Sequence, residues 1–161
     1  MRYFILLTLF FCVNAYASTD DMPDFRSHGI VIAIMPEDGT EEMYEALANE
    51  GLNGYAQLVL MRHAKLESEY GTKGVAMGNG FNWWNQSCSK KYKGKKRIAY
   101  EFEHGRRVKK YWKIFDTPQE AAREQIKFLR RRYRGALTEA SRGNWKGYLR
   151  VLRKGGYFGK V

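Results

Sequence analysis

The chain has 161 residues, of which 44% are apolar and 15% aromatic. That composition is enough to bury a core, so it excludes wholesale disorder and indicates one domain or a compact two-lobed one. Lys and Arg number 28 against 17 Asp and Glu, and 22 of those 28 cations lie in residues 91–161. A half this basic is expected to meet an anionic partner such as nucleic acid, an anionic membrane or an acidic polymer.

Residues 1–17 have the pattern of a cleaved signal peptide. A basic start is followed by the apolar run 4–13 and then by Ala15-Tyr16-Ala17, a small-x-small pattern of the kind that signal peptidase recognises. The run is shorter than the roughly 20 apolar residues of a membrane-spanning helix. We therefore expect cleavage after Ala17, a periplasmic or secreted protein, and no stable membrane insertion. Export favours an envelope polymer over nucleic acid as the partner of the basic half, so we expect no nucleic-acid partner.

The rest of the chain is interpreted as a leader with a short extended apolar segment, residues 18–39, and one folded domain, residues 40–161. Within that domain a helix is predicted from a cap at Thr40 through Ala48. A second helix is predicted from about Tyr55 to Ser68. Residues 71–96 are rich in Gly, Asn, Ser and Lys, a composition typical of a loop.

A β-hairpin is predicted after this loop, because apolar and other side chains alternate with a period of two through residues 98–103. The turn is assigned to His104-Gly105 and the returning strand to residues 108–115. The alternation puts Glu101 and Glu103 on one face of the hairpin.

Two further helices follow the hairpin. The sequence Thr117-Pro118-Gln119-Glu120 is a capping box with Pro at the first helical position, and it predicts a helix through about Tyr133. Asn144 is expected to cap a last helix, which ends at Gly155-Gly156. The predicted fold class is α+β, mostly helical, with one small hairpin lobe.

Glu67 is the strongest candidate for a reactive group. It lies at the C-terminal end of the second predicted helix, before a loop rich in glycine and aromatic residues. The negative end of the helix dipole and nearby aromatic rings both disfavour a negative charge there. Such a position suits a carboxylic acid that holds a proton and donates it. Taken alone, the same residue also fits an ordinary surface acid near a helix end.

The order of these features resembles the bacterial glucosaminidase family, which is mannosyl-glycoprotein endo-β-N-acetylglucosaminidase-like and belongs to the lysozyme-like superfamily. The family includes autolysins, the flagellar rod-associated wall hydrolase and Bax-type proteins. The matching segments lie between about Leu52 and Tyr157, in this order: Glu67-Ser68-x-x-Gly71, Asn79-Gly80-Phe81-Asn82, Tyr100 to Gly105, Trp112 to Ala121, and Gly156-Tyr157. Two features depart from the family pattern, because Asn82 stands where a Gly is usual and the chain after Tyr157 continues differently.

The resemblance implies a lysozyme-like fold, and it makes residues 40–161 a glucosaminidase-like catalytic domain. It implies that Glu67 is the catalytic acid, that Glu101 (or else Glu103) is a second carboxylate, and that Tyr157 stands beside the reacting sugar. Aromatic and amide side chains of the preceding loop are candidates for contacts with pyranose rings and their hydroxyl or acetamido groups. These candidates are Asn79, Phe81, Trp83, Trp84 and Asn85. Core packing is an equally open role for Phe81, and we expect one tryptophan of the pair to pack inward.

The implied activity is an exported peptidoglycan hydrolase that cleaves β-1,4 glycosidic bonds of the glycan strand without a cofactor. Endo-β-N-acetylglucosaminidase and muramidase cleavage both stay open, as do an inverting route through Glu101 and assistance by the substrate's own acetamido group. The alternative is a catalytically inactive lysozyme-like module that binds or scaffolds the wall. In either case the basic runs 90–97 and 130–134 are candidates for attachment to anionic groups.

Two other hydrolase mechanisms have little support in the sequence. A zinc amidase needs clustered ligands, whereas His28, His63 and His104 lack any ligand spacing, so we expect no metal site. A Cys/His peptidase would have to use Cys88, which lies in a lysine-rich loop without a helix start to activate its thiolate. It is also the single cysteine left after signal cleavage, so we expect no internal disulfide.

Overall fold

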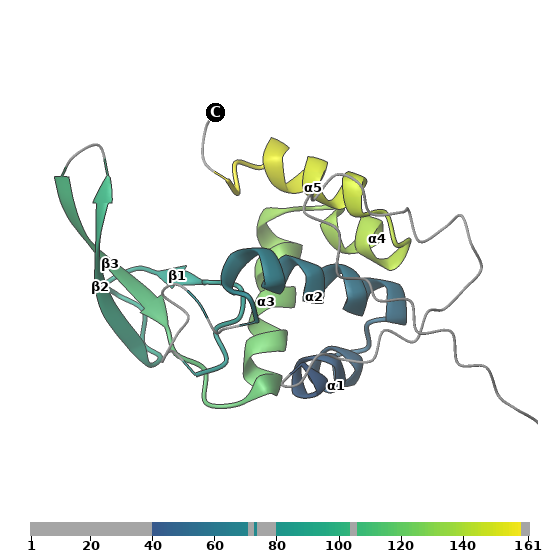
Figure 1. The fold of residues 1–161 in the computed structure, drawn as a ribbon, viewed down its shortest axis with the longest axis horizontal. Coiled ribbons are helices and arrows are strands. Elements are labelled where there is room, and N and C mark those ends of the chain that lie inside the picture. Colours follow the sequence, from purple (N-terminus) through teal and green to yellow (C-terminus); the bar gives the residue numbers. More distant parts are fainter. Residues whose placement is uncertain (1–39, 71–72, 74–79, 104–105, 159–161) are drawn as a thin grey trace, which may run out of the picture.

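The structure, a computed structural model, describes residues 40–70, 73, 80–103 and 106–158. The predicted signal peptide, the leader, Asn79 and the His104-Gly105 turn lie outside the described residues, as does the side chain of Glu103. The fold is α+β and mostly helical, as the sequence predicts. Figure 1 shows the helices gathered into one body and the sheet standing beside it as a separate arm. The elements in chain order are α1 (Glu41–Asn49), α2 (Gly54–Ser68), β1 (Ser87–Cys88), β2 (Lys96–Glu103), β3 (Arg106–Lys113), α3 (Pro118–Arg132), α4 (Ala136–Ser141) and α5 (Trp145–Lys154).

Side-chain caps start three of the helices. The Asn53 side chain accepts a hydrogen bond from the Ala56 N–H (2.9 Å) at the start of α2. Thr117 caps α3 as predicted, because its hydroxyl accepts from the Glu120 N–H (3.1 Å), and Asn144 caps α5 in the same way. The cap predicted for α1 is wrong, since Thr40 makes no side-chain cap bond and already has helical backbone angles.

The sheet has three antiparallel strands in the order β1-β3-β2. Glu103 pairs with Arg106, so two residues connect β2 to β3, as the hairpin prediction requires. The short strand β1 was not predicted, because two residues carry no detectable alternation; it pairs with Trp112 and Tyr111 of β3. The exposed Tyr100 shows that the outer part of the hairpin is not packed on the core.

The hydrophobic core lies between the helices. It contains Met43 and Leu47 of α1, Leu60 of α2, Ile126 and Leu129 of α3, and Tyr148 and Leu152 of α5, together with Trp84 from the loop after α2. The six-residue helix α4, which has no periodic pattern long enough to predict it, adds Ala136 and Ala140. Of the helices the structure describes, none combines the length and the apolar character needed to cross a bilayer.

Candidate active site

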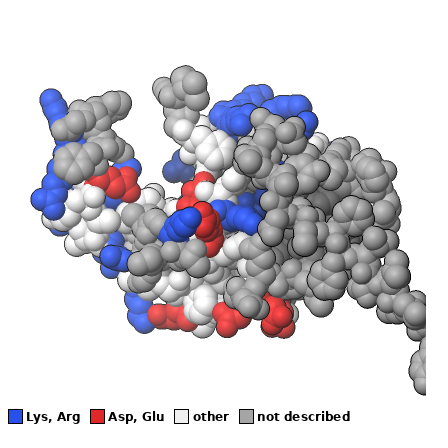
Figure 2. All heavy atoms as spheres, viewed as in Figure 1, with Lys and Arg blue, Asp and Glu red and all other residues white. Residues whose placement is uncertain are grey.

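A cleft of about 950 Å³ lies between the sheet and the helical body. Figure 2 shows this side of the molecule hollowed between the hairpin arm and the helices. The cleft is lined from four directions, by the end of α2, by the loop that leads into β1, by one face of α3 and by the segment after α5. The lining residues include Glu67, Trp84, Asn85, Gln86, Cys88, Tyr92, Lys113, Glu124, Phe128, Arg131, Arg132, Tyr133, Tyr157 and Phe158.

Glu67 lies in the last turn of α2 and lines this cleft. Its side chain is 22% exposed, so the carboxyl group is reachable from solvent but largely enclosed. The Tyr157 hydroxyl is hydrogen-bonded to it, and burial, followed by the charge of Glu67, raises the pKa of Tyr157 well above its usual range. Tyr157 therefore stays a neutral phenol and donates its proton to the bond with Glu67.

A buried histidine stands on the inner side of Glu67. His63 is fully buried, and its Nε2 lies 3.5 Å from Oε1 of Glu67, one turn along the same helix. Its other nitrogen, Nδ1, lies 2.7 Å from the Tyr148 hydroxyl, and its ring meets the Tyr157 ring edge-on. Burial and the nearby charge of Glu67 raise the pKa of Tyr148, which keeps that hydroxyl protonated. A His63 tautomer with its proton on Nε2 lets Tyr148 donate to Nδ1 and directs an N–H toward Glu67.

The loop after α2 is tied to the turn of helix that carries Glu67. The Ser68 hydroxyl donates to the Trp83 carbonyl oxygen (2.6 Å), and the Trp84 indole N–H donates to the Leu60 carbonyl oxygen (3.0 Å). The Asn85 side-chain amide donates to the backbone carbonyl of Glu67 itself. These bonds connect residues 83–85 to α2, two of them to its last turn, so the position of the acid depends on the loop as well as on the helix.

The tryptophan pair is more deeply buried than predicted. Trp83 is 4% exposed and Trp84 is 1% exposed, so the expectation that one ring stays available to a sugar is not met. The reason is that both rings fill the core beside α2 and meet edge-on. Trp84 borders the cleft as part of its floor rather than as an open stacking platform. Phe81 is half-buried against Trp83 and is not among the described residues that line the cleft.

Glu101 lies away from Glu67 and its cleft. It pairs with Val108 in the strand register and forms an ion pair with Lys110 (2.8 Å). Lys113 of β3 lines the cleft, and the alternation along a strand puts Val108, together with its partner Glu101, on the opposite sheet face from Lys113. Glu101 is accordingly absent from the described residues that line the cleft.

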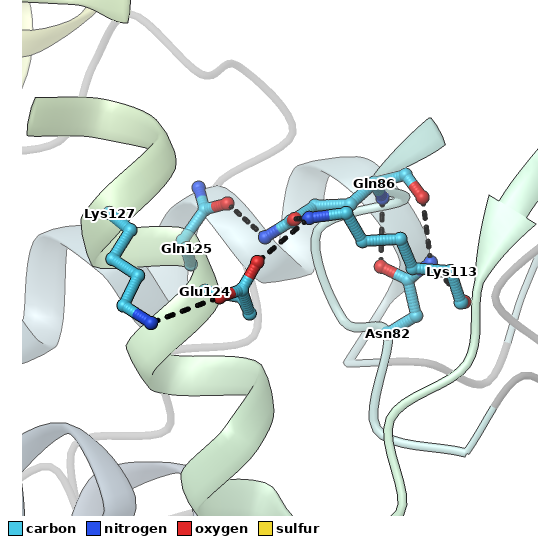
Figure 3. Close-up of polar contacts among 6 residues, drawn as sticks. All are labelled: Asn82, Gln86, Lys113, Glu124, Gln125 and Lys127. Carbon is cyan, nitrogen blue, oxygen red and sulfur yellow. Dashed lines mark hydrogen bonds and ion pairs between the residues drawn. The ribbon is translucent and has the colours of Figure 1, made fainter. Parts of the chain in front are cut away.

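A different carboxylate lines the cleft, Glu124 of α3, and it is ion-paired with two lysines (Figure 3). Lys113 lies 3.1 Å from one carboxylate oxygen and Lys127 lies 3.3 Å from the other. Burial acts to raise the pKa of Glu124, but the bonds and charges of these lysines outweigh it and hold the pKa below the usual value. Glu124 is therefore an anion at neutral pH.

A network of amides continues from this ion pair into the loop (Figure 3). Lys113 also donates to the Gln86 side-chain oxygen (3.0 Å), and the Gln86 amide donates to the buried Gln125 of α3 (2.9 Å). Asn82 accepts from the Gln86 N–H (2.8 Å) and donates to the Lys113 carbonyl oxygen (2.9 Å). The asparagine that departs from the family pattern thus connects the loop to β3.

The sequence interpretation missed His63, Tyr148 and Glu124. The first had a usable signal, because positions four apart on a helix share a face and His63 precedes Glu67 by four. Tyr148 and Glu124 had none, since they come from helices far along the chain.

The part of the chain that the structure describes contains neither a ligand set for a metal ion nor an activated thiol. No three His, Cys, Asp or Glu side chains gather there as ligands. Cys88 lines the cleft, but burial raises the pKa of its thiol despite the charges of Lys96 and Lys113.

No family model matches the chain, and a search of curated proteins finds no match. Among solved structures, the chain is similar to the glycoside hydrolase domain of Salmonella typhimurium FlgJ, with 21% identity and a TM-score of 0.47 over 72% of this chain and 70% of that one. It is also similar to the catalytic domain of the autolysin Auto from Listeria monocytogenes, with 17% identity and a TM-score of 0.46 over 69% of this chain and 66% of that one.

Proposed function

We propose that this chain is an exported glycoside hydrolase that cleaves β-1,4 bonds in the glycan strands of peptidoglycan, with Glu67 as the general acid. The observation that carries the proposal is a partly exposed carboxyl group at the wall of a large cleft, hydrogen-bonded to a neutral phenol and backed by a buried histidine. Polar and aromatic side chains line the rest of that cleft, a combination that suits sugars.

Glycosidic cleavage needs a proton on the leaving oxygen, because an alkoxide leaves a sugar poorly. Protonated Glu67 gives its proton to that oxygen as the bond to the anomeric carbon breaks. Water then supplies a hydroxyl to the anomeric carbon and its second proton to the medium or to a base, which balances the hydrolysis. Tyr157 donates a hydrogen bond to the carboxylate that remains on Glu67.

A second group has to stabilise the positive charge that develops on the sugar or activate the water. Glu124 lines the cleft and is ionised, whereas Glu101 lies on the far face of the sheet from Lys113. Assistance by the substrate's acetamido group, with Tyr157 beside it, is the route that needs no second carboxylate. Variants at both glutamates separate these routes.

The decisive experiment is turbidity loss and zymogram clearing of purified peptidoglycan by residues 18–161. We expect Glu67→Gln to lower the rate by about 10²- to 10⁴-fold. Glu42→Gln, which changes an exposed acid on α1, is the matched control and is expected to clear like the wild type. Equal clearing by wild type and Glu67→Gln would refute the acid assignment, and no clearing by any variant would favour an inactive wall-binding module.

Two parallel measurements complete the test. Glu101→Gln and Glu124→Gln are assayed in the same way, and only a residue that takes part in the reaction should cost several powers of ten in rate. Mass spectrometry of the released fragments identifies the new reducing end, N-acetylglucosamine for a glucosaminidase or N-acetylmuramic acid for a muramidase. Export is tested separately by N-terminal sequencing of the full chain expressed in a bacterium, where we expect the mature protein to begin at Ser18.

A further inference from the structure

Two arginines stand at the edge of the cleft, at the C-terminal end of α3. Glu124, Phe128, Arg131 and Arg132 are spaced by four, seven and eight positions, so they share the face of α3 that lines the cleft. Both arginines are exposed. They are therefore placed to meet a part of a ligand that extends beyond the sugar rings near Glu67.

These arginines differ in their partners from Lys113, which lines the same cleft. Lys113 is bonded to Glu124, whereas neither Arg131 nor Arg132 has an ion pair with another described residue. Glu67 and Glu124 line the same cleft, but their described ion pairs are with other residues. Residues 125–158 contain ten Lys and Arg and a single acid, Glu139, which is paired with Arg142.

We propose that Arg131 and Arg132 bind the carboxylates of the peptide stems carried by the glycan, so that the preferred substrate is a peptide-bearing strand and not a bare one. This inference rests on the proposed function. A guanidinium presents a planar fork of N–H donors that matches a carboxylate in a bidentate way, which a lysine cannot reproduce. Arg131 and Arg132 line the same cleft as Glu67, so the anion that they bind belongs to the polymer whose sugars bind beside Glu67.

A structural role competes with this assignment. Cations in the last turn of a helix interact favourably with its dipole, and Arg130, Arg131 and Arg132 all lie in the last turn of α3. The geometry separates the two roles, because Arg130 and Arg134 line a different hollow of about 550 Å³, bounded by Leu52, Leu137 and Ser141. The two arginine pairs, one of which includes Arg134 just past the end of α3, thus line two different hollows.

That arrangement provides a matched experiment. We measure binding to intact peptidoglycan and to glycan strands from which an amidase has removed the stems. All variants are made in a Glu67→Gln background, so that no polymer is cut. We expect the Arg131→Gln/Arg132→Gln double variant to bind intact peptidoglycan about tenfold more weakly, and stripped glycan unchanged. The Arg130→Gln/Arg134→Gln pair removes the same charge and is expected to bind both polymers like its parent.

Several outcomes would overturn the inference. Equal losses in the two double variants would mean general surface charge, and an equal loss on stripped glycan would mean contact with the sugars. Tighter binding of anionic phospholipid vesicles or of DNA than of peptidoglycan, lost in the Arg131/Arg132 variant, would assign the pair to those partners instead. If that variant is destabilised in thermal unfolding, Arg131→Lys/Arg132→Lys keeps the charge and removes the fork, and we expect it to retain less than half of the stem-dependent gain in affinity.

Failure of this inference is distinguishable from failure of the proposed function. Clearing of peptidoglycan by the wild type, together with stem-independent binding, would refute only the role of the arginines. Absence of clearing would refute the hydrolase, whatever the binding measurements show.

Discussion

The Nε2 atom of His63 lies 3.5 Å from Oε1 of Glu67, and the opposite nitrogen of the same ring lies 2.7 Å from the Tyr148 hydroxyl. A polar connection therefore runs from α5 through a fully buried imidazole to the proposed acid on α2. The buried Nε2 forms no hydrogen bond with another described residue, so the carboxyl group of Glu67, 3.5 Å away, is the polar group that it faces. This arrangement makes His63 a positioning residue for the carboxyl group.

Replacing His63 tests that role. His63→Leu removes the contact with Glu67, and we expect kcat to fall about 10- to 100-fold with little change in KM, because the acid loses its fixed orientation while the sugar contacts stay. His63→Gln keeps a side-chain N–H donor and is expected to recover part of kcat. The measurement is steady-state kinetics on soluble peptidoglycan fragments, with thermal unfolding to confirm that both variants fold. A Gln variant no better than the Leu variant would argue against positioning through a polar contact with Glu67.

Removing the hydroxyl of Tyr157 should affect the reaction more than the fold. The pKa of this phenol is raised by burial and by the charge of Glu67, so it remains a donor across the working pH range. Tyr157→Phe keeps the ring contacts with Phe128 and Tyr133 but loses the bond to Glu67. We expect kcat to fall about tenfold or more and the melting temperature to change little. An unchanged kcat would remove Tyr157 from the reaction.

The ion pairs of Glu124 predict a pH dependence of stability. Its pKa is held below the usual value, so the ionised form is favoured in the folded state. That contribution is fully present above the unfolded pKa of about 4.3 and is lost as the pH falls through the lower folded pKa. In urea unfolding we expect Glu124→Gln to be less stable than wild type by about 1 kcal/mol at pH 7.

The same difference should shrink as the pH falls below the unfolded pKa and through the lower folded pKa of Glu124. Glu42→Gln on α1 controls for the loss of a surface charge and should show a smaller difference that changes less with pH. A stability gap for Glu124→Gln that is constant from pH 7 to pH 3 would show that the ion pairs with Lys113 and Lys127 do not stabilise the fold.

Within the described part of the loop between α2 and β1, residues 80–86, backbone geometry demands glycine at Gly80. Its φ is +59°, and a Cβ there would overlap the carbonyl oxygen of Phe115, to which the loop is bonded through the Phe81 N–H (3.3 Å). We expect Gly80→Ala to lower the free energy of unfolding by about 1–3 kcal/mol. Gly54→Ala, at the open start of α2, is the control and should be neutral or slightly stabilising. Equal effects of the two substitutions would contradict the backbone argument.

The sequence alone predicted the elements that carry the site. The helix that ends at Ser68, the hairpin with its two-residue turn, and the capped helix that starts at Pro118 were all found from periodicity and capping. These signals are local, because a cap or an alternation depends on residues within one turn or one strand. The place of Glu67 at a helix end is also a local signal, but that place alone fits an ordinary surface acid, and the order of the motifs around Glu67 was needed to single it out.

Only the tertiary structure decided which side chains surround that carboxyl group. Tyr148 lies 85 positions from His63, and Glu124 enters the cleft from a helix that follows the whole sheet. Packing also buried both rings of the tryptophan pair, one of which was expected to offer a sugar-binding surface, and it left Glu101 on the far face of the hairpin. Periodicity identifies the face of an element on which a residue lies. Which other element packs against that face depends on burial between residues far apart in the sequence, so no short stretch of sequence determines it.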